Sequence, residues 1–159
     1  MSRVHFPLFI VTLLTLLGSG CSLAGDTLPK AVDLQAVGRI ARAQRLPIVL
    51  FFHETGCPFC REVEDLYLAP LQKDNETSPR FLLRSVEIRR SQPLVAFGGT
   101  RTDNRAFTQQ QGVTLVPHLR FLGPDGEALA PDLVGLTSRD FYSGYLEGSI
   151  TAATAKLRR

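Results

Sequence analysis

The feature that most constrains this chain is the motif Cys57-Pro58-Phe59-Cys60, which follows an apolar run and precedes a segment with helical spacing. The run Ile48-Val49-Leu50-Phe51-Phe52 has the length and residue types of one buried strand. A cysteine in the first turn of a helix faces unpaired backbone N–H groups and the positive end of the helix dipole, and both favour the thiolate. A second cysteine three residues later can close a small disulfide. The motif therefore predicts a strand, a turn and a helix that present a reactive pair of thiols.

Residues 1–24 are expected to form a secretory signal peptide rather than part of a domain. Arg3 gives the leader a positive start, and an apolar stretch follows from Phe6 to Leu17. That stretch is too short to span a hydrocarbon layer of ~30 Å. Small residues end at Ala24, a pattern that suits cleavage before Gly25. We therefore expect export to the periplasm.

A lipid anchor on Cys21 is the second interpretation of the leader. Bacterial lipoprotein signals usually have Leu three residues before the modified cysteine, and this chain has Gly18 there. In either case the remaining chain, residues 25–159, has the size of one ordinary domain.

The charge and the cysteine content narrow the function further. The formal net charge of the full chain is only +3, which gives no reason to expect binding to nucleic acid or to an anionic membrane. Of the three cysteines, Cys21 lies in the leader, which leaves the pair in the motif. A bridge between Cys57 and Cys60 closes a very short loop and removes little entropy from the unfolded chain. The pair is better suited to chemistry than to stabilisation.

Hydrophobic periodicity and turn residues predict a single α/β domain. Because strands alternate with helices, we expect a sheet with helices on both of its faces. The expected elements are, in chain order, a helix capped by Asp33, a strand at 48–52, a helix from Pro58, a strand at 81–88, a loop at 92–104, a helix at 106–111, a strand at 119–122, a turn at 123–126, a strand at 129–134 and a helix capped by Thr137.

Apolar side chains at helical spacing predict which face of each helix is buried. The helix after the motif is expected to kink or stop at Pro70, before a polar break at 75–79. The positions expected to be buried are Leu34, Val37, Ile40 and Ala41 in the first helix, Val63, Leu66, Tyr67 and Leu71 in the second, and Phe141, Tyr145, Leu146 and Ile150 in the last.

This order of elements, the strand–Cys-x-x-Cys–helix unit and the pair Val116-Pro117 before the first strand of a hairpin resemble the thioredoxin family. The resemblance covers roughly residues 31–157, and secreted bacterial thioredoxin-like proteins of disulfide and sulfur-oxidation systems look most similar. It implies a thioredoxin-like α/β fold, with three layers (α/β/α) and a central mixed β-sheet. It also implies thiol–disulfide exchange without a bound cofactor.

The resemblance also implies roles for individual residues. Cys57 is expected to attack a substrate disulfide as the thiolate, and Cys60 to resolve the mixed disulfide, which leaves a redox-active Cys57–Cys60 disulfide. The intervening Pro58 and Phe59 are expected to help set the redox poise. Pro117 corresponds to the family's cis-proline, beside which the Val116 backbone would pair with an extended substrate. An ordinary trans proline entering an edge strand is the alternative.

The chain departs from the family's usual pattern beside the motif. Many thioredoxins have a buried acid six places before the first cysteine, where this chain has Phe51, and often Trp directly before that cysteine, where it has Gly56. A proton acceptor for Cys60 is therefore missing or replaced. Glu54, or else His53, is a candidate for the proton relay. The alternative is that both are solvated loop residues.

Other polar residues near the motif have simpler interpretations. His118 follows Pro117 and is expected to be an exposed strand position, or else to line the substrate groove. The basic residues Arg84, Arg89 and Arg90 are expected to form a solvated face at a strand end.

The sequence favours an exported thiol–disulfide oxidoreductase whose substrates are protein thiols and disulfides, with a weak preference for the reductase direction. A membrane thiol donor or acceptor of electrons is then implied, since the compartment is oxidising. One alternative is a binding module that the disulfide switches without turnover. Another is a zinc- or copper-handling thiol protein, but the histidines offer no second ligand pair at suitable spacing and Met1 is the only methionine, so we expect no metal.

Overall fold

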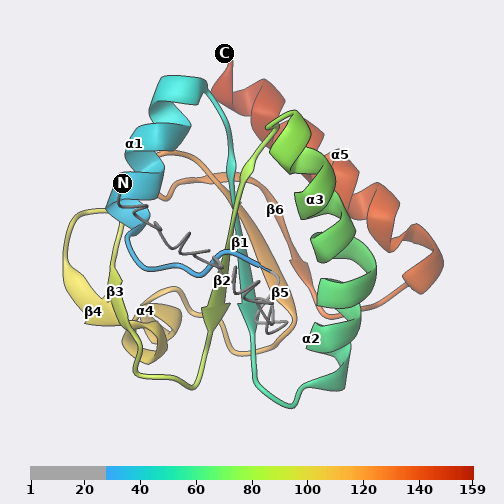
Figure 1. The fold of residues 1–159 in the computed structure, drawn as a ribbon, viewed down its shortest axis with the longest axis horizontal. Helices are drawn as coiled ribbons and strands as arrows, with labels where there is room; N and C mark the ends of the chain where they lie inside the picture. The colour runs from blue at the N-terminus through green and yellow to red at the C-terminus, as the bar shows by residue number, and fades with distance from the viewer. Residues whose placement is uncertain (1–27) are drawn as a thin grey trace, which may run out of the picture.

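The chain folds around one mixed β-sheet (Figure 1). The computed structural model describes residues 28–159, so the predicted signal peptide at 1–24 and the lipid-anchor position Cys21 lie outside the described residues. The strands of the sheet are β1 (Ile48–His53), β2 (Leu82–Glu87), β5 (His118–Leu122) and β6 (Ala128–Val134). They lie in the order β2-β1-β5-β6, with β1 parallel to β2 and the other neighbours antiparallel.

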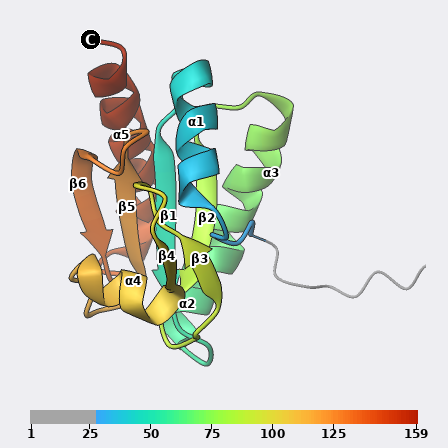
Figure 2. The ribbon, with the colours of Figure 1, turned by 90° about the vertical axis from the view of Figure 1, so that its left-hand side faces the viewer.

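Helices cover both faces of this sheet, which confirms the predicted thioredoxin-like α/β fold. On one face lie α2 (Pro58–Val63), the π-helix η1 (Glu64–Leu68), α3 (Ala69–Thr77) and α5 (Arg139–Leu157). Figure 2 looks onto the other face, with α1 (Leu34–Gln44) and α4 (Asn104–Gln110). Because β1 is buried on both sides, its residues alternate between the two cores: Val49 and Phe51 pack with α2 and α5, whereas Leu50 and Phe52 pack with α1 and α4.

The N-terminal segment of the described chain lies along the open edge of β2. The Ala31 N–H donates to the Ser85 carbonyl at 2.9 Å, and the Ser85 N–H donates to the Pro29 carbonyl at 2.8 Å. Asp33 then caps α1 by accepting from the Ala36 N–H at 2.7 Å, as predicted. The expectation that Ile40 is buried is wrong, because α1 packs through an i, i+3, i+4, i+7 stripe that ends beside it and leaves Ile40 42% exposed.

The helix that follows the motif was predicted to kink or stop at Pro70, and it does not stop there. It continues from α2 through η1 into α3, and in η1 the Ala69 N–H donates to the Glu64 carbonyl five residues back. A proline ring clashes with the carbonyl four residues earlier in a regular α-helix, and the wider π turn relieves that crowding. The extra residue also rotates the apolar stripe, so that Leu66 is 62% exposed and Leu68 is buried in its place.

The polar break expected at 75–79 begins later than predicted. Asn75 is buried inside α3, and its side chain binds the chain as it leaves the helix. Its amide oxygen accepts from the Arg80 N–H at 2.7 Å and its amide nitrogen donates to the Phe81 carbonyl at 3.0 Å. A residue that looks like a loop former in the sequence therefore closes the end of this helix.

The segment expected to be a loop contains a small hairpin instead. Strands β3 (Pro93–Val95) and β4 (Arg101–Asp103) pair antiparallel, and Gly99 in the turn between them has a φ of +82°. Each strand has only three residues, too few for hydrophobic alternation to be recognised. Asp103 then caps α4 by accepting from the Ala106 N–H at 2.9 Å.

The last helix, α5, begins after Ser138, one residue later than the predicted Thr137 cap, and Ser138 makes no side-chain cap hydrogen bond. Its buried face consists of Tyr142, Leu146, Ile150 and Ala153. The predicted Phe141 and Tyr145 lie outside this face and are 64% and 52% exposed, because each precedes the buried stripe by one position. Within residues 28–159 the structure has no helix that is both long and apolar enough to span a membrane.

Candidate functional site

The two motif cysteines form a disulfide at the start of α2. Cys57 is the N-cap residue, and Pro58 follows in the first turn, where a missing N–H costs nothing. The Cα atoms of Cys57 and Cys60 are 5.3 Å apart, and the Cys60 N–H donates to the Cys57 sulfur at 3.1 Å. Cys57 is partly exposed, whereas Cys60 is only 3% exposed and packs in the core. The outer sulfur can therefore be reached by a partner, and the inner one is shielded.

A tight turn delivers Cys57 to the helix. The Cys57 N–H donates to the Glu54 carbonyl at 3.1 Å, and Gly56 at the third position of this turn has a φ of +85°. Turns of this type need a residue that tolerates positive φ at that position. Glycine meets this requirement at position 56.

The pair Val116-Pro117 lies in a loop directly before β5, and its peptide bond is cis, in agreement with the expectation from the family. The Pro117 carbonyl accepts from the Gly135 N–H at 2.7 Å, which ties this loop to the end of β6. Val116 and Cys57 are both partly buried and pack against the same hydrophobic core. The exposed Leu115 in this loop and Phe59 in the first turn of α2 add apolar surface.

The two candidates for the proton relay occupy different environments. The Glu54 carboxylate accepts from Arg89 Nε at 2.8 Å in an ion pair at the surface. His53 ends β1, and its ring stacks on that of Phe51 with centroids 5.2 Å apart. His53 therefore shares a sheet face with Phe51, and Phe51 packs in the same core as Cys60. Of the two, His53 lies on the side of the sheet that carries Cys60.

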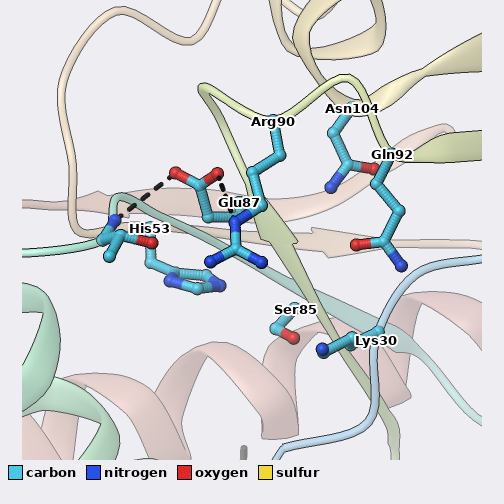
Figure 3. Close-up of a pocket in the computed structure, with 8 residues that line it drawn as sticks. Lys30, His53, Ser85, Glu87, Arg90, Gln92 and Asn104 are labelled. Carbon is cyan, nitrogen blue, oxygen red and sulfur yellow. Dashed lines mark hydrogen bonds and ion pairs between the residues drawn. The ribbon is translucent and has the colours of Figure 1, made fainter.

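A buried acid that the sequence analysis missed, Glu87, lies next to the turn. It ends β2 opposite His53 in the parallel register and is 8% exposed. One carboxylate oxygen accepts from the Thr55 N–H at 3.4 Å and the Arg89 N–H at 3.3 Å, and the other lies 3.5 Å from Arg90 Nε (Figure 3). The register of β1 with β2 is the signal that would have placed this acid beside the motif.

Glu87 faces a small polar pocket, which Figure 3 shows from close up. Its volume is about 40 Å³, which is room for a few water molecules but far below the size of an organic cofactor site. The amide oxygen of the buried Asn104 makes no hydrogen bond within the described part of the chain. The pocket is lined by Lys30, His53, Thr55, Ser85, Glu87, Arg90, Gln92 and Asn104.

His118 is not an exposed strand position, which corrects the prediction. It is 7% exposed, its Nε2 lies 2.8 Å from the Asp132 carboxylate, and its ring meets that of Phe52 edge to face. Since Phe52 packs in the core with α1 and α4, His118 lies on the face opposite Cys60. The Asp132 carboxylate is the polar partner of this buried ring.

The predicted basic face divides into two parts. Arg89 and Arg90 have exposed side chains, as predicted. The Arg84 guanidinium instead donates to the Leu83 carbonyl at 2.6 Å, and partial burial lowers its pKa. Among residues 28–159, no group of three or more His, Cys, Asp or Glu side chains is arranged to hold a metal ion.

Comparison with known proteins places these features in a family. The sequence profile of the thioredoxin-like domain matches residues 34–149. The chain belongs to the thioredoxin-like family. The comparison with curated proteins gives no match.

Solved structures similar to this thioredoxin-like protein include three thioredoxins. Thioredoxin f from spinach chloroplast has a TM-score of 0.51 at 18% identity, and the match covers 80% of this chain and 96% of that one. A thioredoxin from Thermus thermophilus gives 0.53 at 18% identity, over 76% and 85% of the two chains. Fasciola hepatica thioredoxin gives 0.52 at 15% identity, over 78% and 97%. At these identities the likeness concerns the fold.

Proposed function

We propose that this chain is an exported thiol–disulfide oxidoreductase that acts on protein substrates. The observation that carries the proposal is the Cys57–Cys60 disulfide at a helix start, with one sulfur partly exposed and the other buried. A disulfide across so short a loop stabilises little, so its placement at the surface points to exchange. The cis Val116-Pro117 bond and the thioredoxin-like family support the same conclusion.

The reaction runs in two exchanges when the protein acts as a reductase. The Cys57 thiolate attacks one sulfur of a substrate disulfide, forms a mixed disulfide and releases the other substrate sulfur as a thiolate. The Cys60 thiolate then attacks the Cys57 sulfur, which expels the second substrate thiolate and restores the Cys57–Cys60 disulfide. Two electrons pass to the substrate, and the same steps in reverse oxidise a dithiol substrate.

Other chain segments contribute to this cycle in our proposal. The Val116 backbone pairs with an extended substrate segment beside Pro117, and Pro58 and Phe59 tune the redox poise of the cysteine pair. Export to the periplasm, with or without a lipid anchor on Cys21, is supported by the leader at 1–24. A membrane thiol protein then supplies or accepts the electrons, and secreted bacterial thioredoxin-like proteins are the proposed subgroup.

The proton that Cys60 gains or loses needs an acceptor, because the usual acid position is occupied by the buried Phe51. We propose that Glu54 or His53 fills this role, and the position of His53 on the Cys60 side of the sheet favours His53. The pH–rate profiles of Glu54→Gln and His53→Gln test this. A profile that overlays the parent's removes that residue from the relay.

Reduction of insulin with dithiothreitol as electron source tests the enzymatic proposal. The parent protein is expected to reduce insulin catalytically, and Cys57→Ser is expected to abolish turnover. Cys60→Ser is expected to accumulate the mixed disulfide, which mass spectrometry detects. Ser143→Ala, at an exposed position of α5, serves as the control. A parent that binds a partner according to its redox state but turns over no disulfide supports the switched binding module instead.

The direction of electron flow follows from the reduction potential of the Cys57–Cys60 couple. We propose the reductase direction, since Glu64 and Asp65, which follow the motif in the helix, oppose an additional negative charge on Cys57. Equilibration with glutathione redox buffers measures the potential. A value near ~−270 mV, as in thioredoxin, agrees with a reductase, whereas a value near ~−120 mV indicates an oxidase.

A further inference from the structure

A second groove, separate from the small polar pocket, includes Arg89, whose guanidinium binds Glu54 at the start of the turn into Cys57. Its volume is about 400 Å³, and it runs between the end of β2 and α4. The residues that line it are Ile88, Arg89, Arg105, Thr108, Gln109 and Val113. The sequence alone predicts only a solvated basic face at Arg89.

Residues on both sides of this groove are connected to the proposed active site, by contacts on one side and along the chain on the other. On one side the Ile88 N–H donates to the His53 carbonyl at 2.9 Å, and Arg89 binds Glu54, the residue that begins the turn into Cys57. On the other side Val113 lies three residues before Val116 in the chain. The Arg89–Glu54 contact therefore puts one side of the groove next to the turn that leads into Cys57.

The groove is cationic and its lining contains no carboxylate. The Arg105 guanidinium donates to the Arg89 carbonyl at 2.9 Å, which holds the two arginines close together, and Arg105 makes no ion pair within residues 28–159. Of the carboxylates nearby, Glu54 binds the groove residue Arg89, and Asp103 accepts from the Ala106 N–H at the start of α4, so neither pairs with Arg105. The Arg105 charge is thus not neutralised by a described side chain.

The floor of the groove consists of the buried side chains of Val113 and Thr108. Val113 is 6% exposed and Thr108 is 4% exposed, with the Thr108 hydroxyl donating to the Asn104 carbonyl at 2.7 Å. Guanidinium groups at the rim of a partly apolar groove bind carboxylates through two parallel hydrogen bonds and keep donors for a second acceptor.

We propose that this groove binds an acidic segment of the substrate protein, a few residues away from the disulfide that Cys57 attacks. The inference rests on the proposed function and names its preferred substrates as disulfides flanked by Asp or Glu side chains. Arg105 binds these side chains, and Ile88 and Val113 contact the aliphatic parts of the segment. Electrostatic attraction of this kind raises the rate of encounter and weakens with salt.

The test uses two synthetic peptides that share one disulfide and differ only in a flanking segment, Glu-Glu in one and Gln-Gln in the other. With dithiothreitol as electron source, the parent's kcat/KM is expected to be about fivefold higher for the acidic peptide, the ratio given by a favourable exposed ion pair. The ratio is expected to approach one in high salt and in Arg105→Gln. The matched control Arg39→Gln removes the same charge from an exposed position in α1 and is expected to keep the parent's ratio.

The outcomes separate this inference from the proposed function. Turnover of neither peptide by the parent contradicts the proposed enzymatic activity itself. Turnover of both peptides at equal rates leaves the activity intact and overturns the acidic-substrate inference. A ratio that Arg105→Gln and Arg39→Gln lower equally also overturns it, because the effect then comes from net charge and not from the groove.

Discussion

The backbone conformation of Gly56 sets the path by which the chain enters the motif Cys57-Pro58-Phe59-Cys60. Its φ of +85° lies in the left-handed region, and a Cβ built there would meet no heavy atom within 4 Å. A side chain at this position is therefore opposed by the backbone conformation and not by crowding. The turn that this glycine allows fixes the direction from which Cys57 meets the helix.

Gly56→Ala is expected to lower the free energy of unfolding by about 1 kcal/mol, because alanine resists positive φ. Urea denaturation of the oxidised protein measures this change. Gly98→Ala is the control, since Gly98 is also exposed and unhindered but has no positive φ. Equal effects of the two substitutions would contradict the role given to the turn.

Glu87 is the second residue whose importance lies in its contacts with the turn. Removing its carboxylate in Glu87→Ala leaves the Thr55 and Arg89 N–H groups without their acceptor, and we expect a loss of about 1–2 kcal/mol in unfolding free energy. Glu87→Gln keeps an amide oxygen at the same place and is expected to lose less. Thermal or urea unfolding compares both with Glu76→Ala, an exposed position of α3. Indistinguishable stability of Glu87→Ala and the parent would exclude this anchoring role.

At the scale of the element, the π turn of η1 decides which leucine enters the core. A regular helix continued from α2 would bury Leu66, whereas the structure buries Leu68 to 1% exposure and leaves Leu66 at 62%. The π turn takes up one more residue than an α-helical turn, so the helix after it is rotated and Leu68 occupies the buried position in place of Leu66.

The two leucines provide a matched pair of substitutions. Leu68→Ala is expected to cost about 2–5 kcal/mol, because it removes buried methyl groups and leaves a cavity. Leu66→Ala is expected to change stability by less than about 0.5 kcal/mol, as for other exposed sites. Denaturant midpoints measure both, and a larger loss for Leu66→Ala would show that the helix is regular.

The sequence predicts elements whose signals are local. The Asp33 cap, the apolar run from Ile48 to Phe52 and the turn at 123–126 all act within a few residues, and the structure has them as predicted. The hairpin of β3 and β4 is too short for a periodic signal, and the π turn shifts a stripe that periodicity assumes to be regular.

The residues of the proposed site also differ in whether their neighbours in the sequence identify them. The cysteine pair and the cis-proline are recognisable because their neighbours in sequence identify them. Glu87 and Arg105 are not, because what matters about them is a contact with a residue far away in the chain: Glu87 reaches Thr55, and Arg105 reaches Arg89. Such contacts exist only once the strand register and the helix positions are fixed.

At the scale of the whole molecule, two ion pairs tie α5 to the rest of its layer. Arg139, the first residue of α5, binds Glu62 of α2, and the Tyr67 hydroxyl donates to the Arg139 carbonyl at 3.1 Å. Further along, Arg80 binds Glu147 of α5 through two hydrogen bonds of 2.9 Å. Hydrogen bonds from these arginines lower the pKa of Glu62 and of Glu147.

The lowered pKa of Glu147 predicts a pH dependence of stability. Because the folded state holds this proton less tightly than the unfolded state, the ion pair stabilises the fold above the ordinary pKa of 4.5 and loses its effect as the pH falls through the lower folded value. Glu147→Gln is expected to cost about 0.5 kcal/mol at neutral pH and almost nothing in strong acid.

Urea titrations of parent and Glu147→Gln at neutral and acidic pH measure this difference. The exposed Glu76→Gln, which lies outside both ion pairs, is the control. A difference between parent and Glu147→Gln that stays constant with pH would assign the effect to packing and not to charge.

Residues 29–31 pair with Ser85 and so cover the outer edge of β2. Removing the chain up to Ala31 would expose the backbone hydrogen-bonding groups at the outer edge of β2. An exposed edge strand can pair with a strand of a second molecule and cause aggregation. An affinity tag or a tether should therefore be attached before Leu28, so that residues 29–31 still cover the edge of β2.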